Sequence, residues 1–253
     1  MDRRSFFKKS ALAGVATLSI PEILKAAMPG VSSLDNEDSS LLSKGDVILF
    51  QGDSITDGGR NRNREDEPNL PAQLGGGYVL YAAAHILANN AGKELKNYNR
   101  GISGNKVFQL AERWEKDCIA LKPNLLSILI GVNDFWHIKT NAYTGTIVDY
   151  EADYRKLLER TLTALPGIRI AICEPFIIHG GRALDNTWDR NFTPYREAAK
   201  ALASSFNLTF VPFQSVFNEA LKKAPAAYWG ADGVHPSMAG AQLMAQAWIK
   251  AVL

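Results

Sequence analysis

The chain has 253 residues, of which 46% are hydrophobic, and this is enough for one domain with a sizeable core. Its formal net charge at pH 7 is +2. Five basic and two acidic side chains fall within the first 30 residues, so the rest of the chain has a net charge of −1 and carries no basic stripe. This distribution argues against nucleic acid as a partner.

The N-terminus has the pattern of an export signal. The segment Arg3-Arg4-Ser5-Phe6-Phe7 resembles a twin-arginine motif, and a short apolar run follows from Ala11 to Ile20. That run is too short to cross a bilayer as a helix. We predict an export signal over residues 1–30, a flexible leader over 31–44 and one folded domain over 45–253, with the protein periplasmic or extracellular. The alternative for the first segment is a disordered basic tail.

Strand-like and helix-like segments alternate along the domain. The strand-like apolar runs lie at 46–51, 95–99, 125–131, 168–174 and 208–212. Segments with helical periodicity lie at 77–91, 107–121, 150–164, 194–205, 214–223 and 237–252. Alternation of this kind predicts βαβ crossovers, so we expect an α/β fold, a three-layer α/β/α sandwich with about five parallel strands. The run at 125–131 is almost wholly apolar, as expected for a strand that is covered on both faces.

The two cysteines fall in segments that look like core. Cys118 lies in an amphipathic helix pattern and Cys173 ends a strand pattern. An exported protein is permitted a disulfide, but these positions favour buried free thiols. Their spacing gives no C-x-x-C metal or redox motif.

Four short polar blocks follow apolar runs or close the chain: Gly52-Asp53-Ser54-Ile55-Thr56, Ser103-Gly104-Asn105, Gly131-Val132-Asn133-Asp134 and Asp232-Gly233-Val234-His235-Pro236. In an open parallel sheet, the ends of the strands bring such blocks to one edge, where ligands bind. A serine hydroxyl is inert until an imidazole takes its proton, and a carboxylate must orient that imidazole. The blocks offer all three groups in Ser54, His235 and Asp232.

These blocks, in this order, resemble those of the SGNH hydrolases, also called the GDSL lipase/esterase family. They span residues 52 to 236, and the leucine usual after the serine is Ile55 here. The resemblance implies a flavodoxin-like hydrolase domain over 45–253 and a carboxylic ester hydrolase. It assigns Ser54 as nucleophile, with His235 as base and Asp232 as its partner. It also assigns an oxyanion hole of the Ser54 amide, the Gly104 amide and the Asn133 side chain.

Each assigned residue has an ordinary structural alternative. Ser54 could be a helix N-cap, Gly104 a turn glycine and Asn133 part of an Asx turn. Glycine at position 104 would let its N–H approach a substrate closely, because it has no side chain. Two other histidines, His137 and His179, follow strands but have no carboxylate at the spacing that serves His235.

A metal-dependent hydrolase is the main mechanistic alternative. Carboxylates and imidazole bind divalent ions, and the candidate ligands are Asp53, Asp57, Asp134, Asp232 and His235. No H-x-H or D-x-D spacing supports such a site, and a metal mechanism would leave Ser54 without a role. We therefore expect neither a metal nor a cofactor.

Two long connections suggest the substrate. Residues 57–76 carry Arg60 and Arg62, and the loop Phe176–Phe192 carries Arg182 and Trp188; we predict that both wall the cleft. Arginine and tryptophan suit sugars, and no long apolar lid suggests a lipase. We expect acetyl or other short acyl esters of small molecules or oligosaccharides as substrates, without stable membrane insertion. A lysophospholipase or thioesterase, and a non-catalytic carbohydrate-binding protein, remain as alternatives.

Overall fold

The computed structural model describes residues 20–30 and 41–253. Its centre is a sheet of five parallel strands in the order β2-β1-β3-β4-β5. The strands are β1 (Val47–Gly52), β2 (Lys96–Asn99), β3 (Leu125–Leu129), β4 (Arg169–Cys173) and β5 (Thr209–Val211). This order is the flavodoxin-like one, in which the crevice for ligands lies where β1 and β3 end.

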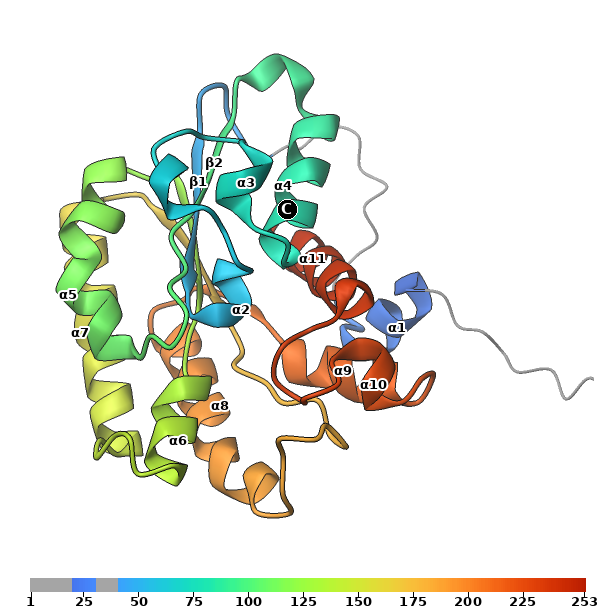
Figure 1. The fold of residues 1–253 in the computed structure, drawn as a ribbon. Coiled ribbons are helices and arrows are strands. Elements are labelled where there is room, and N and C mark those ends of the chain that lie inside the picture. Colours follow the sequence, from blue (N-terminus) through green and yellow to red (C-terminus); the bar gives the residue numbers. More distant parts are fainter. Residues whose placement is uncertain (1–19, 31–40) are drawn as a thin grey trace, which may run out of the picture.

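Helices cover both faces of the sheet, as Figure 1 shows. One layer contains α5 (Val107–Asp117), α7 (Ile147–Ala164) and α8 (Trp188–Ser205). The other contains α4 (Tyr78–Asn89), α9 (Phe213–Leu221) and α11 (Met238–Val252), with α1 (Ile20–Ala27) and α10 (Ala226–Trp229) packed outside α9. Short helices follow the strands or lie in the loops: α2 (Ser54–Asp57), α3 (Pro71–Leu74) and α6 (Val132–Lys139). The predicted three-layer α/β/α sandwich is therefore confirmed.

Tryptophans join the layers to the sheet and to each other. The Trp248 ring of α11 lies 5.0 Å from the Phe50 ring, and its indole N–H donates to Ser127 Oγ of β3 at 2.9 Å. In the opposite layer, Trp114 of α5 donates to Thr161 Oγ1 of α7 at 2.9 Å. Both indoles are fully buried, so each N–H has its partner inside the core.

One predicted helix boundary is wrong. Helix α8 begins at Trp188 and not at residue 194, so the loop predicted over Phe176–Phe192 ends at residue 187. Proline is uncommon inside a helix because it lacks the N–H that the helix bonds require. In the structure Pro194 lies inside the helix, and the extra turns bury Trp188 and Phe192.

The N-terminal prediction can be followed only in part. Arg3, Arg4 and the apolar run up to residue 19 lie outside the described residues, so the export signal stays a prediction. Residues 20–27 form α1, whose Ile23 and Leu24 are buried against the domain, where α1 contacts α9. Among the residues that the structure describes, no helix is both long enough and apolar enough to span a membrane.

Both cysteines are free and buried, as predicted. Burial raises the pKa of Cys118 and of Cys173 to about 12.

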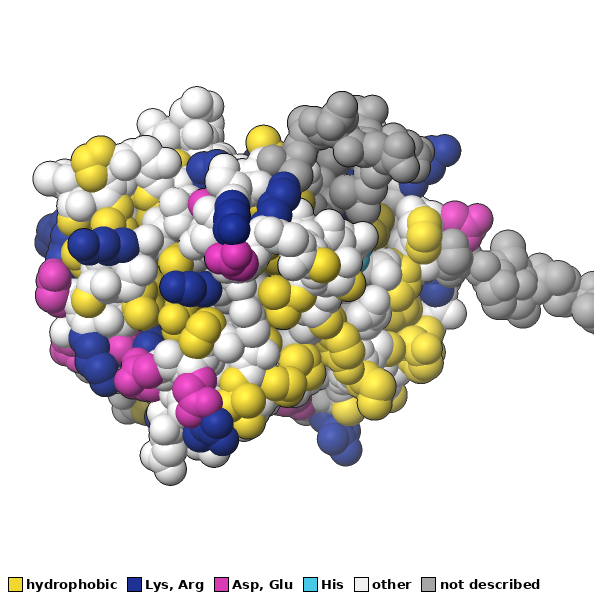
Figure 2. All heavy atoms as spheres, turned by 90° about the horizontal axis from the view of Figure 1, so that it is seen from above, with side chains coloured by type: hydrophobic (Ala, Val, Ile, Leu, Met, Phe, Trp, Pro, Cys, Tyr) yellow, Lys and Arg dark blue, Asp and Glu magenta, His cyan; other side chains and the backbone are white. Residues whose placement is uncertain are grey.

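The surface at the edge where the strands begin carries basic and acidic side chains interspersed with apolar ones (Figure 2). The candidate site lies at the opposite edge, where the strands end.

Candidate active site

Ser54, His235 and Asp232 form a continuous chain of hydrogen bonds. Ser54 is the first residue of α2, directly after β1. Its Oγ lies 2.8 Å from Nε2 of His235, and Nδ1 of His235 lies 2.7 Å from Oδ2 of Asp232. A carboxylate only accepts, so Nδ1 carries the proton and Nε2 is free to accept from the serine. This is the arrangement that nucleophilic ester chemistry requires.

The backbone of the same turn holds the Asp232 carboxylate. Its Oδ1 accepts from the amides of Val234 at 2.9 Å and of His235 at 2.8 Å. Partial burial acts to raise the pKa of Asp232, but the hydrogen bonds from His235 and Val234 outweigh it, so the pKa lies below its usual value. Asp232 therefore stays charged and fixes the orientation of the imidazole.

Asp53, and not Ser54, caps the short helix α2. Its Oδ1 accepts from the Ile55 amide at 3.0 Å, which leaves the Ser54 hydroxyl free to face His235. Asp53 is 1% exposed, and burial raises its pKa to about 7. The N-cap alternative for Ser54 is therefore wrong.

Three hydrogen-bond donors lie on the loops around Ser54. In the described part of the chain, the amides of Ser54 and Gly104 donate to no protein acceptor. Gly104 has φ +84°, a conformation that favours glycine. Asn133, near the start of α6, donates through Nδ2 to the Asn105 carbonyl at 3.2 Å, and its second N–H is not used in that bond. That all three donors converge on one oxyanion stays a prediction.

The loop 101–104 is fastened to the nucleophile helix by two side chains. Asp57 Oδ2 accepts from the Ser103 amide at 3.0 Å, and Arg60 Nε donates to the Gly101 carbonyl at 2.9 Å. The side chain of Arg60 is fully buried. Our expectation that Arg60 walls the cleft is wrong, because its guanidinium turns inward to hold this loop.

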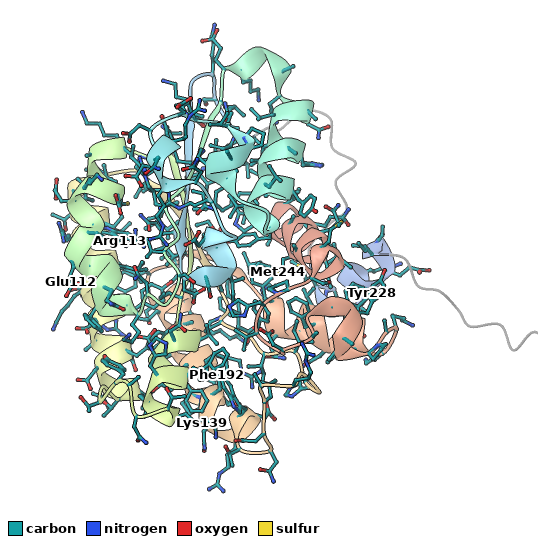
Figure 3. All side chains as sticks on the ribbon, in the orientation of Figure 1. Glu112, Arg113, Lys139, Phe192, Tyr228 and Met244 are labelled. Atoms are coloured by element: carbon teal, nitrogen blue, oxygen red, sulfur yellow. The ribbon has the colours of Figure 1, made fainter. Side chains whose placement is uncertain are left out.

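A second arginine, Arg113 of α5, donates hydrogen bonds to the chain where β1 and β2 end. Figure 3 shows Arg113 on the side of α5 that faces the sheet, whereas Glu112 points outward. Arg113 Nη1 donates to the Arg100 carbonyl at 2.8 Å, to Gln51 Oε1 at 3.0 Å and to Asp117 Oδ2 at 2.9 Å. Arg113 Nε also donates to Asn105 Oδ1 at 2.9 Å, so Arg113 contacts the chain on both sides of the loop that holds Gly104.

Asp134 joins the block at 131–134 to α5. Its Oδ1 accepts from the Val107 amide, the first of α5, at 3.1 Å, while its Oδ2 has no hydrogen-bond partner in the described part of the chain. The carboxyl is 2% exposed, and burial raises its pKa to about 7. The sequence suggested Asp134 only as a candidate metal ligand, and its contact with the first amide of α5 was not predicted.

A cleft of about 390 Å³ opens at Ser54 and His235. Its walls include backbone from both ends of the connection predicted over 57–76, namely Gly58-Gly59 and Gly76-Gly77. Tyr78, Ser103, Pro236 and Ala241 complete much of the lining. This connection therefore walls the cleft as predicted, but with glycine backbone; Arg62 instead pairs with Asp57 at 2.7 Å.

The other predicted loop behaves differently, because Arg182 is exposed and does not line the cleft at Ser54. Trp188 is 1% exposed and packs at 5.0 Å against the Phe135 ring, so it is a core side chain and not an open stacking surface. His137 Nδ1 lies 3.0 Å from Lys106 Nζ. Within 20–30 and 41–253, no three side chains of His, Cys, Asp or Glu are grouped as ligands for a metal ion.

The family comparison agrees with this geometry. The model of the GDSL-like Lipase/Acylhydrolase family matches residues 50–243. An acetylxylan esterase from Geobacillus stearothermophilus is 37% identical over 215 residues, which are 83% of this chain and 95% of that protein. Its crystal structure has a TM-score of 0.74 and covers 85% of this chain and 97% of its own.

Solved relatives extend the likeness. A crystal structure of a GDSL-like lipase from Parabacteroides merdae ATCC 43184 is 53% identical, has a TM-score of 0.81, and covers 83% of this chain and 96% of that chain. The Geobacillus esterase has also been solved as catalytic mutants in which a serine, an aspartate or a histidine is replaced by alanine. The resemblance carried by the four sequence blocks is thus confirmed: the chain belongs to the GDSL-like Lipase/Acylhydrolase family and is a carboxylic ester hydrolase.

Proposed function

We propose that the protein is a serine esterase that removes acetyl groups from carbohydrate through an acyl-enzyme on Ser54. One observation carries the proposal. Ser54, His235 and Asp232 are linked by hydrogen bonds of 2.8 and 2.7 Å, and both Ser54 and His235 line the cleft. A base and an orienting carboxylate that are aligned in this way activate a serine hydroxyl toward esters.

In the first half of the reaction, Ser54 Oγ attacks the ester carbonyl while His235 Nε2 takes its proton. The carbonyl oxygen becomes an oxyanion, which the amides of Ser54 and Gly104 and the Asn133 side chain stabilise. When the tetrahedral intermediate collapses, the bond to the sugar oxygen breaks. His235 returns the proton to that oxygen, and the free sugar hydroxyl leaves.

In the second half, water attacks the acetyl-serine. His235 removes a proton from the water, the same donors hold the new oxyanion, and the bond to Ser54 Oγ breaks. The proton returns to Ser54, and acetate leaves. Asp232 stays charged throughout and stabilises the imidazolium that forms twice in each cycle.

The size and chemistry of the cleft favour a short acyl group. The cleft of about 390 Å³ is lined by glycine, serine and histidine beside four apolar side chains, so a long alkyl chain would contact polar as well as apolar groups. Each methylene that stays in water forgoes roughly 0.8 kcal/mol of stabilisation. Octanoyl esters, which have six methylenes more than acetyl esters, therefore gain little from binding here.

The relatives support the choice of carbohydrate. The curated one is an acetylxylan esterase, and solved variants of it are described as an acetyl-xylooligosaccharide esterase. In its catalytic mutants the replaced aspartate and histidine are three positions apart. Asp232 and His235 have the same spacing here.

Hydrolysis of matched esters tests the proposal. We expect kcat/KM on p-nitrophenyl acetate to exceed that on p-nitrophenyl octanoate by at least about tenfold. Acetylated xylose and acetylated xylo-oligosaccharides should release acetate. Preference for octanoate would favour the lysophospholipase or thioesterase alternative, and no hydrolysis of any ester would favour the binding protein.

Export is a separate part of the proposal. An enzyme that deacetylates polysaccharide fragments meets them outside the cytoplasm, which suits the twin-arginine-like segment at Arg3-Arg4. Fractionation of cells that express the full chain tests this. Replacement of both arginines by lysine should retain the protein in the cytoplasm, and unchanged export would contradict a twin-arginine route.

A further inference from the structure

A second cavity lies behind the turn that carries Asp232 and His235. It has a volume of about 270 Å³, and the residues around it come from the loop after β4 and the first turn of α8. Its lining is formed by Ile177, His179, Gly180, Leu184, Asp185, Asn186, Trp188 and Asp189. The cavity at Ser54 and this one are lined by different residues, and the reaction described above uses none of those around the second.

The loop that lines the second cavity is hydrogen-bonded to the turn that carries Asp232 and His235. Ile178 and Ala183 donate their amides to the carbonyls of Gly233 at 2.7 Å and Asp232 at 2.9 Å. Gly181 packs so closely that a Cβ there would lie 2.1 Å from the Gly233 Cα. The loop thus follows the catalytic turn along its length (Figure 1), and a ligand in the second cavity would lie beside that turn.

The polar groups around the cavity are of the kind that binds hydroxyls. The Trp188 indole N–H is buried and has no hydrogen-bond partner among residues 20–30 and 41–253, although a buried donor normally has one. The Asn186 side chain makes no hydrogen bond to the described part of the chain, and His179 has only a long contact of 3.7 Å, to Asp189. Ile177 and Leu184 add an apolar wall of the kind that the C–H face of a sugar ring contacts.

The charges around the cavity are already balanced. Asp185 pairs with Lys139 of α6 at 2.7 Å and also accepts from the Thr187 hydroxyl. Asp189 lies 3.5 Å from Arg196. Balanced charges disfavour a cation or an anion as occupant, whereas unpaired amide, indole and imidazole groups suit a neutral polyhydroxyl ligand.

We propose that this cavity is a sugar subsite, which binds a neighbouring unit of an oligosaccharide while the acetylated unit occupies the cleft at Ser54. The inference rests on the proposed function and adds that the preferred substrate has at least two sugar units. Binding energy gained at the second unit would lower KM for longer substrates and leave the reacting groups unchanged.

Replacement of Asn186 tests the subsite. Asn186→Ala removes a hydrogen-bonding side chain, and Asn186→Trp fills the space; both sit at an exposed position, so neither should disturb folding. The matched control is Asn191→Ala, an exposed asparagine of α8 that does not line the cavity. The substrates are acetylated xylotriose, acetylated xylose and p-nitrophenyl acetate.

We expect both Asn186 variants to raise KM for acetylated xylotriose by about fivefold to tenfold, because one or two hydrogen bonds are lost. kcat/KM on acetylated xylose and on p-nitrophenyl acetate should stay within about twofold, as should all values for Asn191→Ala. Unacetylated xylotriose should also bind the Ser54→Ala protein with a Kd that rises by the same factor in Asn186→Ala.

The results that overturn the subsite differ from those that overturn the proposed function. If the wild-type enzyme cleaves acetylated xylose and xylotriose equally well and the Asn186 variants change neither, the subsite is wrong and the deacetylase remains. If it cleaves p-nitrophenyl acetate but no acetylated sugar, the carbohydrate proposal fails, and the subsite fails with it.

Discussion

The carboxylate of Asp57 accepts the backbone amide of Ser103 at 3.0 Å, and so joins the helix that begins with the nucleophile to the loop that holds Gly104. The two residues are 46 positions apart in the chain. Because the same oxygen also accepts from Arg62 at 2.7 Å, the carboxylate keeps its charge paired inside the protein. The proposed nucleophile and the proposed oxyanion donor are thus held next to each other.

Asp57→Asn tests this link. Asparagine has the same shape but offers only one acceptor oxygen, so it cannot serve both the Ser103 amide and the Arg60 amide, which Asp57 accepts through its other oxygen at 3.1 Å. We expect kcat to fall by about tenfold to a hundredfold with little change in KM, since a displaced donor weakens the transition state. Steady-state kinetics on p-nitrophenyl acetate measure both constants.

Arg62→Ala is the matched control for that experiment. The Arg62 side chain is 48% exposed and touches the same Asp57 oxygen, but its loss leaves the bond to Ser103 intact. Its kcat should stay within about threefold of the wild type. An equal loss of kcat in both variants would mean that the ion pair of Asp57 with Arg62 matters, and not its hydrogen bond to the Ser103 amide.

Ser54→Ala should lower kcat by about 10⁴ or more, because serine and base act as a unit. The circular dichroism spectrum should not change, since the hydroxyl is hydrogen-bonded to His235 alone among the described residues. Ser103→Ala, in the same cleft but with no bond from its hydroxyl to His235, should lose less than about tenfold. An active Ser54→Ala protein, or one that requires a divalent metal, would rule out the covalent mechanism.

Asn133→Ala should lower kcat by roughly 10² to 10³ and leave KM nearly unchanged, because the side-chain amide acts on charge that develops only in the transition state. Single-turnover kinetics with p-nitrophenyl acetate give the acylation rate directly. If KM alone rises, Asn133 binds the ground state and is not part of an oxyanion hole.

Asp134→Asn should stabilise the protein at alkaline pH. Burial raises the pKa of Asp134 from an ordinary 3.8 to about 7, so the folded protein holds a proton that the unfolded chain has released. Stability is therefore lost as the pH rises from about 4 to about 7. Asparagine keeps an oxygen for the Val107 amide and never ionises. Its Tm should exceed the wild-type value by at least about 3 °C near pH 8.

That gain should shrink as the pH is lowered to about 4, where Asp134 is protonated in the fold in any case. Calorimetry at a series of pH values measures the difference. Asp153→Asn, at a half-exposed position of α7, is the control and should show no such pH-dependent gain. A constant difference between Asp134→Asn and the wild type at all pH values would contradict a role for ionisation.

The sheet, and the proximity of three candidate reacting groups at one edge of it, could be predicted because local patterns determine them. The run at Leu125–Leu129 is buried along its whole length, and continuous apolar sequence of that kind is typical of a central parallel strand. Ser54, Asp232 and His235 follow from short motifs whose chemistry requires neighbours, and the parallel topology brings strand ends to one edge.

The supporting residues could not be predicted, because their roles depend on contacts between distant segments. Arg60 sits in a charged, polar stretch that reads as solvated loop, yet its guanidinium is buried against the Gly101 carbonyl. Trp188 lies in a segment that was predicted to be a loop, and its aromatic packing against Phe135 and Trp136 explains its place in the core. Sequence periodicity carries no information on such pairings.

The reactivity of the two buried thiols can be used to measure local unfolding of the protein. With both pKa values at about 12, roughly one thiol in 10⁵ is ionised at neutral pH, and only the thiolate reacts with alkylating reagents. Cys118 follows the last turn of α5, whereas Cys173 ends a strand inside the sheet. Alkylation followed by mass spectrometry would therefore report two separate events without any engineered probe. Labelling of Cys118 reports local unfolding at the end of α5, and labelling of Cys173 reports unfolding of the central sheet.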